Sequence, residues 1–164
     1  MNIRKAEIGD LQELLDIYNY EVEHGVATLD LQPKNIVEWE KWFSAHNVDN
    51  HPLFVAEKEG KVAGYASLSA YREKEAYRTT VELSIYIGPQ YRRQGIATVL
   101  MEFILEQARR DERIHTVVSV ITAGNAASTR LHEKFGFEFC GTIREVGMKF
   151  GQYQGIDNYR LTVE

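Results

Sequence analysis

The stretch from residue 79 to residue 122 constrains the fold of this chain more than any other. Residues 79–88, "TTVELSIYIG", are rich in β-branched and aromatic side chains and predict a central strand. The loop "YRRQGIA" at residues 91–97 leads into a helix predicted from about Gly95 to Arg110, and "HTVVSVIT" at 115–122 predicts another strand. A strand, a helix and a second strand in this order form a βαβ unit, so part of the sheet is expected to be parallel.

The rest of the chain predicts further strands and helices around this unit. Alternating or β-rich patterns mark the segments 2–8, 54–57, 62–70, 137–150 and 159–164. Helical patterns mark 9–25, 34–47 and 126–136. Asp10 is predicted to cap the first helix, and Glu59 and Gly60 form the turn of a hairpin. The order indicates a single α/β layer with a largely antiparallel sheet that turns parallel in its second half.

Length, charge and cysteine usage narrow the class of protein. A chain of 164 residues fits one domain, residues 1–164, and the net charge of −5 argues against a nucleic-acid partner. The only cysteine, Cys140, excludes an intrachain disulfide and is predicted to be a packing residue. No apolar run suits a signal peptide or a membrane span, so a cytoplasmic protein is expected. The five histidines show no metal-ligand spacing.

The glycine loop at residues 93–98 is a candidate binding site for a phosphate group. The first N–H groups of a helix have no partner within the helix, and the helix dipole adds partial positive charge there. Gly95 lets the backbone approach a ligand closely, so a pyrophosphate would satisfy several donors at once. On spacing alone, a solvated turn with flanking arginines fits equally. No Gly-Lys-Ser/Thr sequence follows, so the loop is not a P-loop.

Three motifs resemble those of one enzyme family. "RRQGIA" resembles the Q/R-x-x-G-x-G/A signature of the GNAT N-acetyltransferase superfamily, and "VELSIYIGPQY" resembles the strand before it. "NAASTRLHEKFGFEFCG" resembles a later segment of that family. The resemblance covers essentially the whole chain. "GVATLDLQP", "AYRTTVELSIYI" and "REVGMKFGQYQG" are similar to the phosphinothricin N-acetyltransferase branch, which acetylates the α-amino group of phosphinothricin, methionine sulfoximine and methionine sulfone.

The resemblance implies a fold, a co-substrate and a partner. The implied fold is a single α/β layer with a mixed, mostly antiparallel sheet of about six to seven strands and about four helices on both faces. The implied co-substrate is acetyl-CoA, with direct transfer to a small amino-acid-like amine. The branch also implies a homodimer. Two alternatives remain open: another acceptor, such as a protein N-terminus, a polyamine or an antibiotic, and a non-catalytic acetyl-CoA sensor.

The resemblance also implies two catalytic residues. Alternation alone would allow Glu82 to face water, but the branch places a general base at this position of "TVE". The helical pattern alone favours a surface position for His132, whereas the branch implies an acid for the leaving thiolate or a relay for the amine proton. Tyr153 and Tyr159 are weaker alternatives for the acid.

Binding residues follow from the same resemblance. The predicted acetyl-CoA contacts are the backbone of Ile85, Tyr86 and Ile87, the loop residues Arg93, Gln94, Gly95, Ile96, Ala97 and Thr98, and the pair Asn125 and Ser128, for which helix capping is the alternative. The predicted acceptor contacts are Thr28, Leu29, Arg72, Tyr77 and Arg78. Arg72 is the best candidate to bind a carboxylate. Arg78, Thr79 and Asp157 depart from the branch pattern, which leaves the exact acceptor open.

Overall fold

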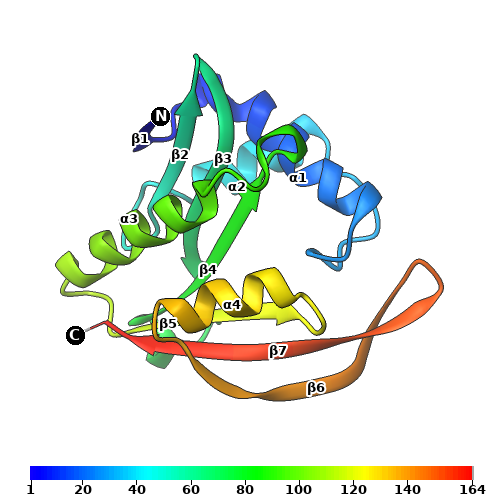
Figure 1. Cartoon of the computed structure of the whole chain (residues 1–164). Coiled ribbons are helices and arrows are strands. Elements are labelled where there is room, and N and C mark those ends of the chain that lie inside the picture. The colour runs from blue at the N-terminus through cyan, green and yellow to red at the C-terminus, as the bar shows by residue number, and fades with distance from the viewer. Residues whose placement is uncertain (164) are drawn as a thin grey trace.

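Residues 1–163 of the computed structural model form one seven-stranded sheet with helices on both faces (Figure 1). The strand order is β1-β2-β3-β4-β5-β7-β6, and of the paired strands only β4 and β5 run parallel. The strands are β1 (Asn2–Lys5), β2 (Leu53–Lys58), β3 (Lys61–Ala70), β4 (Thr80–Ile87), β5 (Thr116–Thr122), β6 (Glu138–Lys149) and β7 (Gln152–Thr162). The predicted mixed, mostly antiparallel sheet is therefore confirmed.

Four helices cover the sheet, two on each face, as predicted. They are α1 (Leu11–His24), α2 (Ile36–Ser44), α3 (Ile96–Arg110) and α4 (Ala126–Lys134). One apolar cluster joins α1 and α2 to side chains of β2 and β3, such as Leu53 and Tyr65. The other cluster joins α3 and part of α4 to the opposite face, where Leu68 and Val117 point. Side chains alternate along each strand, so β2, β3 and β4 contribute to both clusters, whereas β5 and β7 contribute only to the second.

The start of α1 differs from the prediction. Asp10 occupies the N-cap position, but its side chain makes no capping hydrogen bond to the helix. Its carboxylate instead accepts from both terminal nitrogens of Arg4 at 2.8 Å and from the backbone N–H of Glu7 at 2.8 Å. This two-pronged, charge-assisted pair engages both carboxylate oxygens, and it lowers the pKa of Asp10. Asp10 thus ties the first strand to the first helix.

The last strand is longer than predicted. β7 begins at Gln152 rather than at residue 159, and it pairs with β5 on one side and with β6 on the other. Its first half, "QYQGIDN", is polar and carries a glycine, so no apolar alternation reveals it. β6 and β7 form a long hairpin at the edge of the sheet, drawn in orange and red in Figure 1.

The two parallel strands pair over only a short distance. β4 follows β3 from Val81, opposite Ala70, to Ile87, opposite Gly64. Its register with β5 ends at Glu82, which lies opposite Val118. Beyond that point β5 continues against β7, and within residues 1–163 the stretch 83–87 of β4 has no strand partner on its other side. The sheet therefore contains a gap between β4 and β5 that begins at Glu82.

Candidate active site

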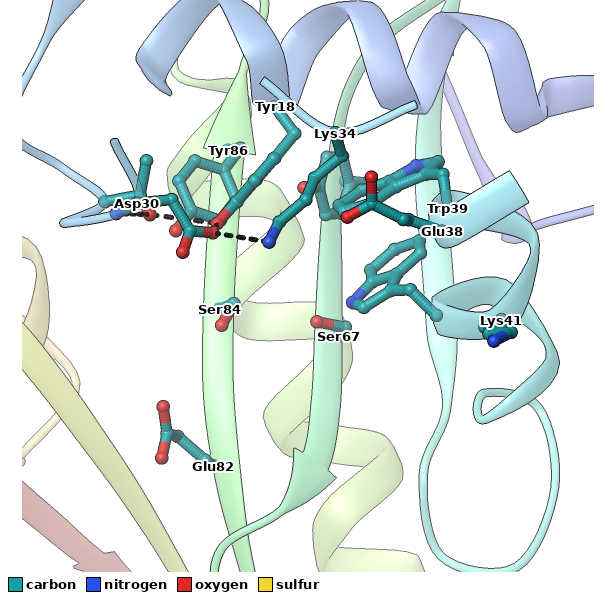
Figure 2. A pocket seen from close by; sticks show the side chains of 13 residues that line it. Tyr18, Asp30, Lys34, Glu38, Trp39, Lys41, Ser67, Glu82, Ser84 and Tyr86 are labelled. Atoms are coloured by element: carbon teal, nitrogen blue, oxygen red, sulfur yellow. Dashed lines mark hydrogen bonds and ion pairs between the residues drawn. The ribbon is translucent and has the colours of Figure 1, made fainter. Parts of the chain in front are cut away.

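A pocket of about 540 Å³ lies on the α1 and α2 face of the sheet, beside this gap. Alternation along β4 directs Glu82, Ser84 and Tyr86 to the same side, as Figure 2 shows. The other lining residues come from β3, from the two helices and from the loop between them: Tyr18, Thr28, Asp30, Lys34, Glu38, Trp39, Lys41, Trp42, Tyr65 and Ser67. The pocket thus combines aromatic walls with carboxylates, ammonium groups and hydroxyls.

Glu82 is the acidic group nearest to the gap. It is half-buried and lies at the opposite end of the β4 row from Tyr86 (Figure 2). Burial raises the pKa of the Glu82 carboxyl, and the positive charge of Arg72 opposes that shift. A carboxylate with a raised pKa is better matched to proton transfer near neutral pH than an ordinary surface glutamate. The arrangement can therefore accept a proton from a group bound in the pocket.

The far end of the pocket is a network around Tyr18. Its hydroxyl contacts Thr28 Oγ1 at 2.9 Å and donates to Asp30, whose carboxylate also pairs with Lys34 Nζ at 3.7 Å. Its ring stacks on Trp39 with the centroids 4.8 Å apart. Burial and the hydrogen bond to Asp30 raise the pKa of Tyr18, so its hydroxyl is a neutral donor. Thr28 thus lines this pocket, and its contact with an acceptor stays a prediction.

A buried lysine holds the loop that carries Thr28, and sequence reasoning missed it. Lys149 is 2 % exposed, and its ammonium donates to the carbonyl of Thr28 at 2.8 Å. Thr122 at the end of β5 donates to the carbonyl of Val26 at 2.6 Å. Burial lowers the pKa of Lys149, and the charges of Glu21 and Asp30 oppose that shift. A lysine near a hairpin end has no distinctive local pattern, so only the folded chain identifies this contact.

The remaining predicted acceptor residues lie outside the pocket lining. Arg72 is exposed, and its guanidinium lies 5.0 Å from the ring centre of Tyr71 and 6.0 Å from that of Tyr77. Arg78 is exposed and pairs with Glu75. Leu29 faces the β6–β7 hairpin, because a Cβ on Gly147 would lie 3.0 Å from its Cδ1. Of Arg72, Tyr77, Arg78 and Leu29, only Arg72 acts electrostatically on Glu82.

The backbone of the loop before α3 adopts the left-handed conformation that the presence of Gly95 led us to expect. Arg93 and Gly95 have φ values of 61° and 77°, and no side chain caps the helix that starts at Ile96. The Ile96 side chain is 2 % exposed and packs in the core, so its backbone is the part of it that can meet a ligand. Gln94 accepts from Lys58 Nζ and donates to the carbonyl of Gln90. Ala97 and Thr98 form the first turn of the helix, where N–H groups are free for an anion.

The other predicted acetyl-CoA residues flank the gap. Ile85 and Ile87 pack against the core on the α3 face, and Tyr86 points into the pocket. Their peptide groups border the unpaired side of β4. Asn125 Oδ1 accepts from the backbone N–H of Ser128 at 3.1 Å, so the capping alternative for this pair is observed. A contact of Asn125 and Ser128 with acetyl-CoA stays a prediction.

His132 is buried, contrary to the surface position that its helical pattern favoured. Its residue exposure is 5 %, because α4 packs this side of the helix against β5 and β7. Its Nδ1 lies 2.7 Å from the carbonyl oxygen of Ser128, and its Nε2 lies 2.7 Å from Ser119 Oγ. Burial lowers the pKa of His132, so the neutral ring is favoured. Glu82 and His132 lie on opposite faces of the sheet, on either side of the gap.

The described residues contain neither a candidate metal cluster nor a candidate membrane-spanning helix. Over residues 1–163, no three side chains of His, Cys, Asp or Glu gather as a metal ion would need. No helix in the same range is long and apolar enough to cross a membrane.

Comparisons with known proteins agree with this geometry. Residues 11–137 match the model of the acetyltransferase (GNAT) family. The chain is 35 % identical to an L-methionine sulfoximine/L-methionine sulfone acetyltransferase of Pseudomonas paraeruginosa, over 99 % of this chain and 95 % of that protein.

Two solved structures are also similar. One is a phosphinothricin acetyltransferase from Sinorhizobium meliloti in complex with acetyl-CoA, with a TM-score of 0.94 and 32 % identity over 98 % of this chain and 87 % of that one. The other is a ribosomal-protein-alanine N-acetyltransferase from Brucella melitensis, with a TM-score of 0.95 and 38 % identity over 99 % of both chains. The chain described here belongs to the GNAT family of acetyltransferases.

Proposed function

We propose that this enzyme transfers the acetyl group of acetyl-CoA to the α-amino group of a small amino-acid-like substrate, of the phosphinothricin, methionine sulfoximine or methionine sulfone type. The observation that carries the proposal is the half-buried carboxylate of Glu82, which faces the pocket at the point where β4 and β5 part. The names of the similar enzymes support the acceptor class.

The residues around the gap fit acetyl-CoA. The stretch of β4 from Ile85 to Ile87 offers unpaired peptide groups to a pantetheine arm, in the manner of an added strand. The uncapped loop from Arg93 to Thr98 offers N–H groups to a pyrophosphate. Acetyl-CoA supplies the activated thioester when bound. Asn125 and Ser128, beside His132, complete the proposed cofactor contacts.

On the pocket side, we assign binding and proton transfer to separate residues. Glu82 takes the first proton from the substrate ammonium and makes the nitrogen nucleophilic. Arg72 binds the substrate carboxylate, and Thr28 contributes to the acceptor site. Leu29, Tyr77 and Arg78 support this end of the site without lining the pocket. Whether Glu82 acts directly or through water does not change the residue on which the proton arrives.

An assay of thiol release tests the proposal. Purified enzyme is given acetyl-CoA with methionine sulfone, methionine sulfoximine, phosphinothricin or a peptide that starts with alanine. We expect the highest kcat/KM with one of the three amino-acid-like acceptors. Preference for the peptide would favour the second candidate, acetylation of a protein N-terminus, which the Brucella structure suggests. Binding of acetyl-CoA without turnover on any amine would indicate a sensor.

Replacing Arg72 by Gln should change both acceptor binding and the pH profile. Because the Arg72 charge lowers the pKa of Glu82, its removal should move the acidic limb of kcat/KM to higher pH. The KM of the amino-acid acceptor should rise by about tenfold, since a charge-assisted contact is lost. Steady-state kinetics across pH measure both effects. Lys74→Gln, at an exposed position of the same segment, is the control. An unshifted limb would exclude the electrostatic link.

We also propose that the enzyme is a homodimer, with the β6–β7 hairpin at the interface. This edge of the sheet exposes six large apolar side chains: Phe139, Ile143, Val146, Met148, Phe150 and Tyr153. Such a patch at a sheet edge is suited to association with another copy.

Val146→Glu tests the proposed dimer. The added charge would be desolvated in an apolar interface, so we expect the variant to sediment as a monomer while the wild type sediments as a dimer. Val37→Glu is the matched control, because Val37 on α2 is 60 % exposed and lies outside the patch. A wild-type protein that stays monomeric at micromolar concentration would contradict the proposal.

We further propose that residues 1–164 work as one acetyltransferase domain in the cytoplasm. The exposed free thiol of Cys140 supports a reducing environment, although the prediction of a packing role for this residue is wrong.

A further inference from the structure

The described residues include two buried histidines that each bond a serine with the same geometry. In His132 the Nδ1 lies 2.7 Å from the carbonyl oxygen four residues earlier, and the Nε2 lies 2.7 Å from Ser119 Oγ. In His46 the Nδ1 lies 2.7 Å from the carbonyl oxygen of Trp42, and the Nε2 lies 2.7 Å from Ser69 Oγ. Both histidines are 5 % exposed.

The carbonyl contact determines which ring nitrogen carries the proton. A carbonyl oxygen only accepts, so Nδ1 of each histidine must be the donor. In the neutral ring, Nε2 is then an acceptor, and the serine hydroxyl donates to it. His132 in its resting state can therefore take up a proton through Ser119, but it has none to give at Nε2.

The two pairs differ in their place in the sheet. Ser119 follows Val118, the last residue of β5 that pairs with β4, so the backbone of Ser119 lies at the start of the gap. Alternation places its side chain on the α4 face, opposite to the face of Glu82. Ser69 lies on β3, opposite Glu82 in an intact antiparallel ladder. Only Ser119 therefore borders the space in which the thioester is proposed to lie.

We propose that Ser119 is a catalytic residue that shuttles a proton between the attacking nitrogen and the leaving sulfur, with His132 as the temporary proton store. The inference rests on the proposed acetyl transfer and adds a residue to that site. His132 is 5 % exposed and has both nitrogens engaged, so it acts through Ser119 and is a positioning residue.

The proposed proton transfer through Ser119 takes place in two steps. In the tetrahedral adduct, nitrogen and sulfur are bonded to the same carbon, so one hydroxyl beside that carbon can reach both. After Glu82 has removed the first ammonium proton, the remaining excess proton on nitrogen passes to Ser119 Oγ, and the Ser119 hydroxyl proton passes to His132 Nε2. The carbon–sulfur bond then breaks with its electron pair on sulfur. Sulfur takes a proton from Ser119 Oγ, and His132 returns its proton to Ser119.

The buried surroundings of His132 suit such temporary storage. A protonated imidazole on the α4 face would be desolvated there, so it gives its proton back readily once the thiolate forms. The products are the amide and the free thiol, and both residues end in their starting states. No external proton donor is needed on this face of the sheet.

Variants of the two histidine-bonded serines, Ser119 and Ser69, test the proposed proton shuttle. Ser119→Ala should lower kcat by about a hundredfold, the lower end of the usual range for losing a proton-transfer group, with both KM values within about twofold of wild type. Ser119→Thr keeps the hydroxyl and should restore most of kcat. Ser69→Ala removes the equivalent bond to His46 and should change kcat by less than about twofold. Equal losses in both alanine variants, or none in Ser119→Ala, would overturn the shuttle.

Nitrogen NMR of the His132 ring gives a readout without turnover. In the wild type at neutral pH, Nδ1 should be protonated and Nε2 should be an unprotonated acceptor whose signal shifts in Ser119→Ala. A proton on Nε2 of the free wild-type enzyme would contradict the proposed direction of transfer. Absence of wild-type turnover on every amine would contradict the proposed function, whereas normal turnover with a fully active Ser119→Ala would contradict the shuttle alone.

Discussion

Glu82→Gln is expected to lower kcat by about a hundred- to a thousandfold, because the amide keeps the shape of the side chain but cannot accept a proton. The KM of acetyl-CoA should stay within about twofold, since the proposed cofactor contacts are backbone groups elsewhere. The wild-type rate should rise with pH through the raised pKa of Glu82, because the ionised form is the base. That acidic limb should disappear in the variant. Stopped and continuous thiol-release assays between pH 5 and 9 measure both changes.

Glu40, an exposed glutamate, is the control residue for the Glu82→Gln experiment. Glu40→Gln on α2 makes the same chemical change on the outer surface of the helix and should leave kcat and the pH profile as in the wild type. If Glu82→Gln kept most of kcat and the same acidic limb, another group would have to be the base.

Gly95→Asp is expected to weaken acetyl-CoA binding by more than about tenfold. Gly95 has a φ of 77°, a left-handed conformation that costs most residues about 1–2 kcal/mol but that Asp, like Asn, adopts more readily. The charge of the new side chain is therefore the main expected cause of the loss. The new carboxylate would lie at the proposed pyrophosphate site and repel the phosphates. Isothermal titration calorimetry with acetyl-CoA measures the loss.

Two control variants separate the effect of the backbone conformation from the effect of the added charge. Asn tolerates the left-handed conformation, so Gly95→Asn should retain more affinity than Gly95→Asp, and the difference between them reports the charge. Gly151 has a φ of 73° in the turn between β6 and β7, which lies well away from the start of α3 in Figure 1. Gly151→Asp should therefore lower the melting temperature without changing affinity. Undiminished binding by Gly95→Asp would exclude the loop as the pyrophosphate site.

The sequence pattern alone was enough to predict those helices, strands and turns whose own residues specify them. The β-branched run of β4, the glycine loop and the amphipathic α3 were predicted nearly to the residue, because period and turn chemistry agree there. The Glu59–Gly60 turn was predicted for the same reason. The polar start of β7 was missed, since its pairing with two neighbours, and not its composition, makes it a strand. The capping role of Asp10 was wrong because Arg4, six residues away, competes for the carboxylate.

The features of the candidate site likewise fall into those that the sequence predicted and those that only the folded chain reveals. Glu82 was predicted from the family resemblance, because alternation alone would also allow it to face water, and the glycine loop was predicted because a helix start exposes N–H groups. The burial of His132, its bond to Ser119 and the contact of Lys149 with the Thr28 loop had no local signal. Each of these joins residues that are distant along the chain or on different elements.

By itself, the order of apolar, polar and glycine residues determined the mixed sheet, the place of the glycine loop and the family resemblance. The tertiary structure alone decided where β4 and β5 stop pairing, and hence that Glu82 and the Ser119–His132 pair stand on opposite faces of one gap. The physical reason is that strand register and side-chain burial are set by packing between distant segments, which no local periodicity records.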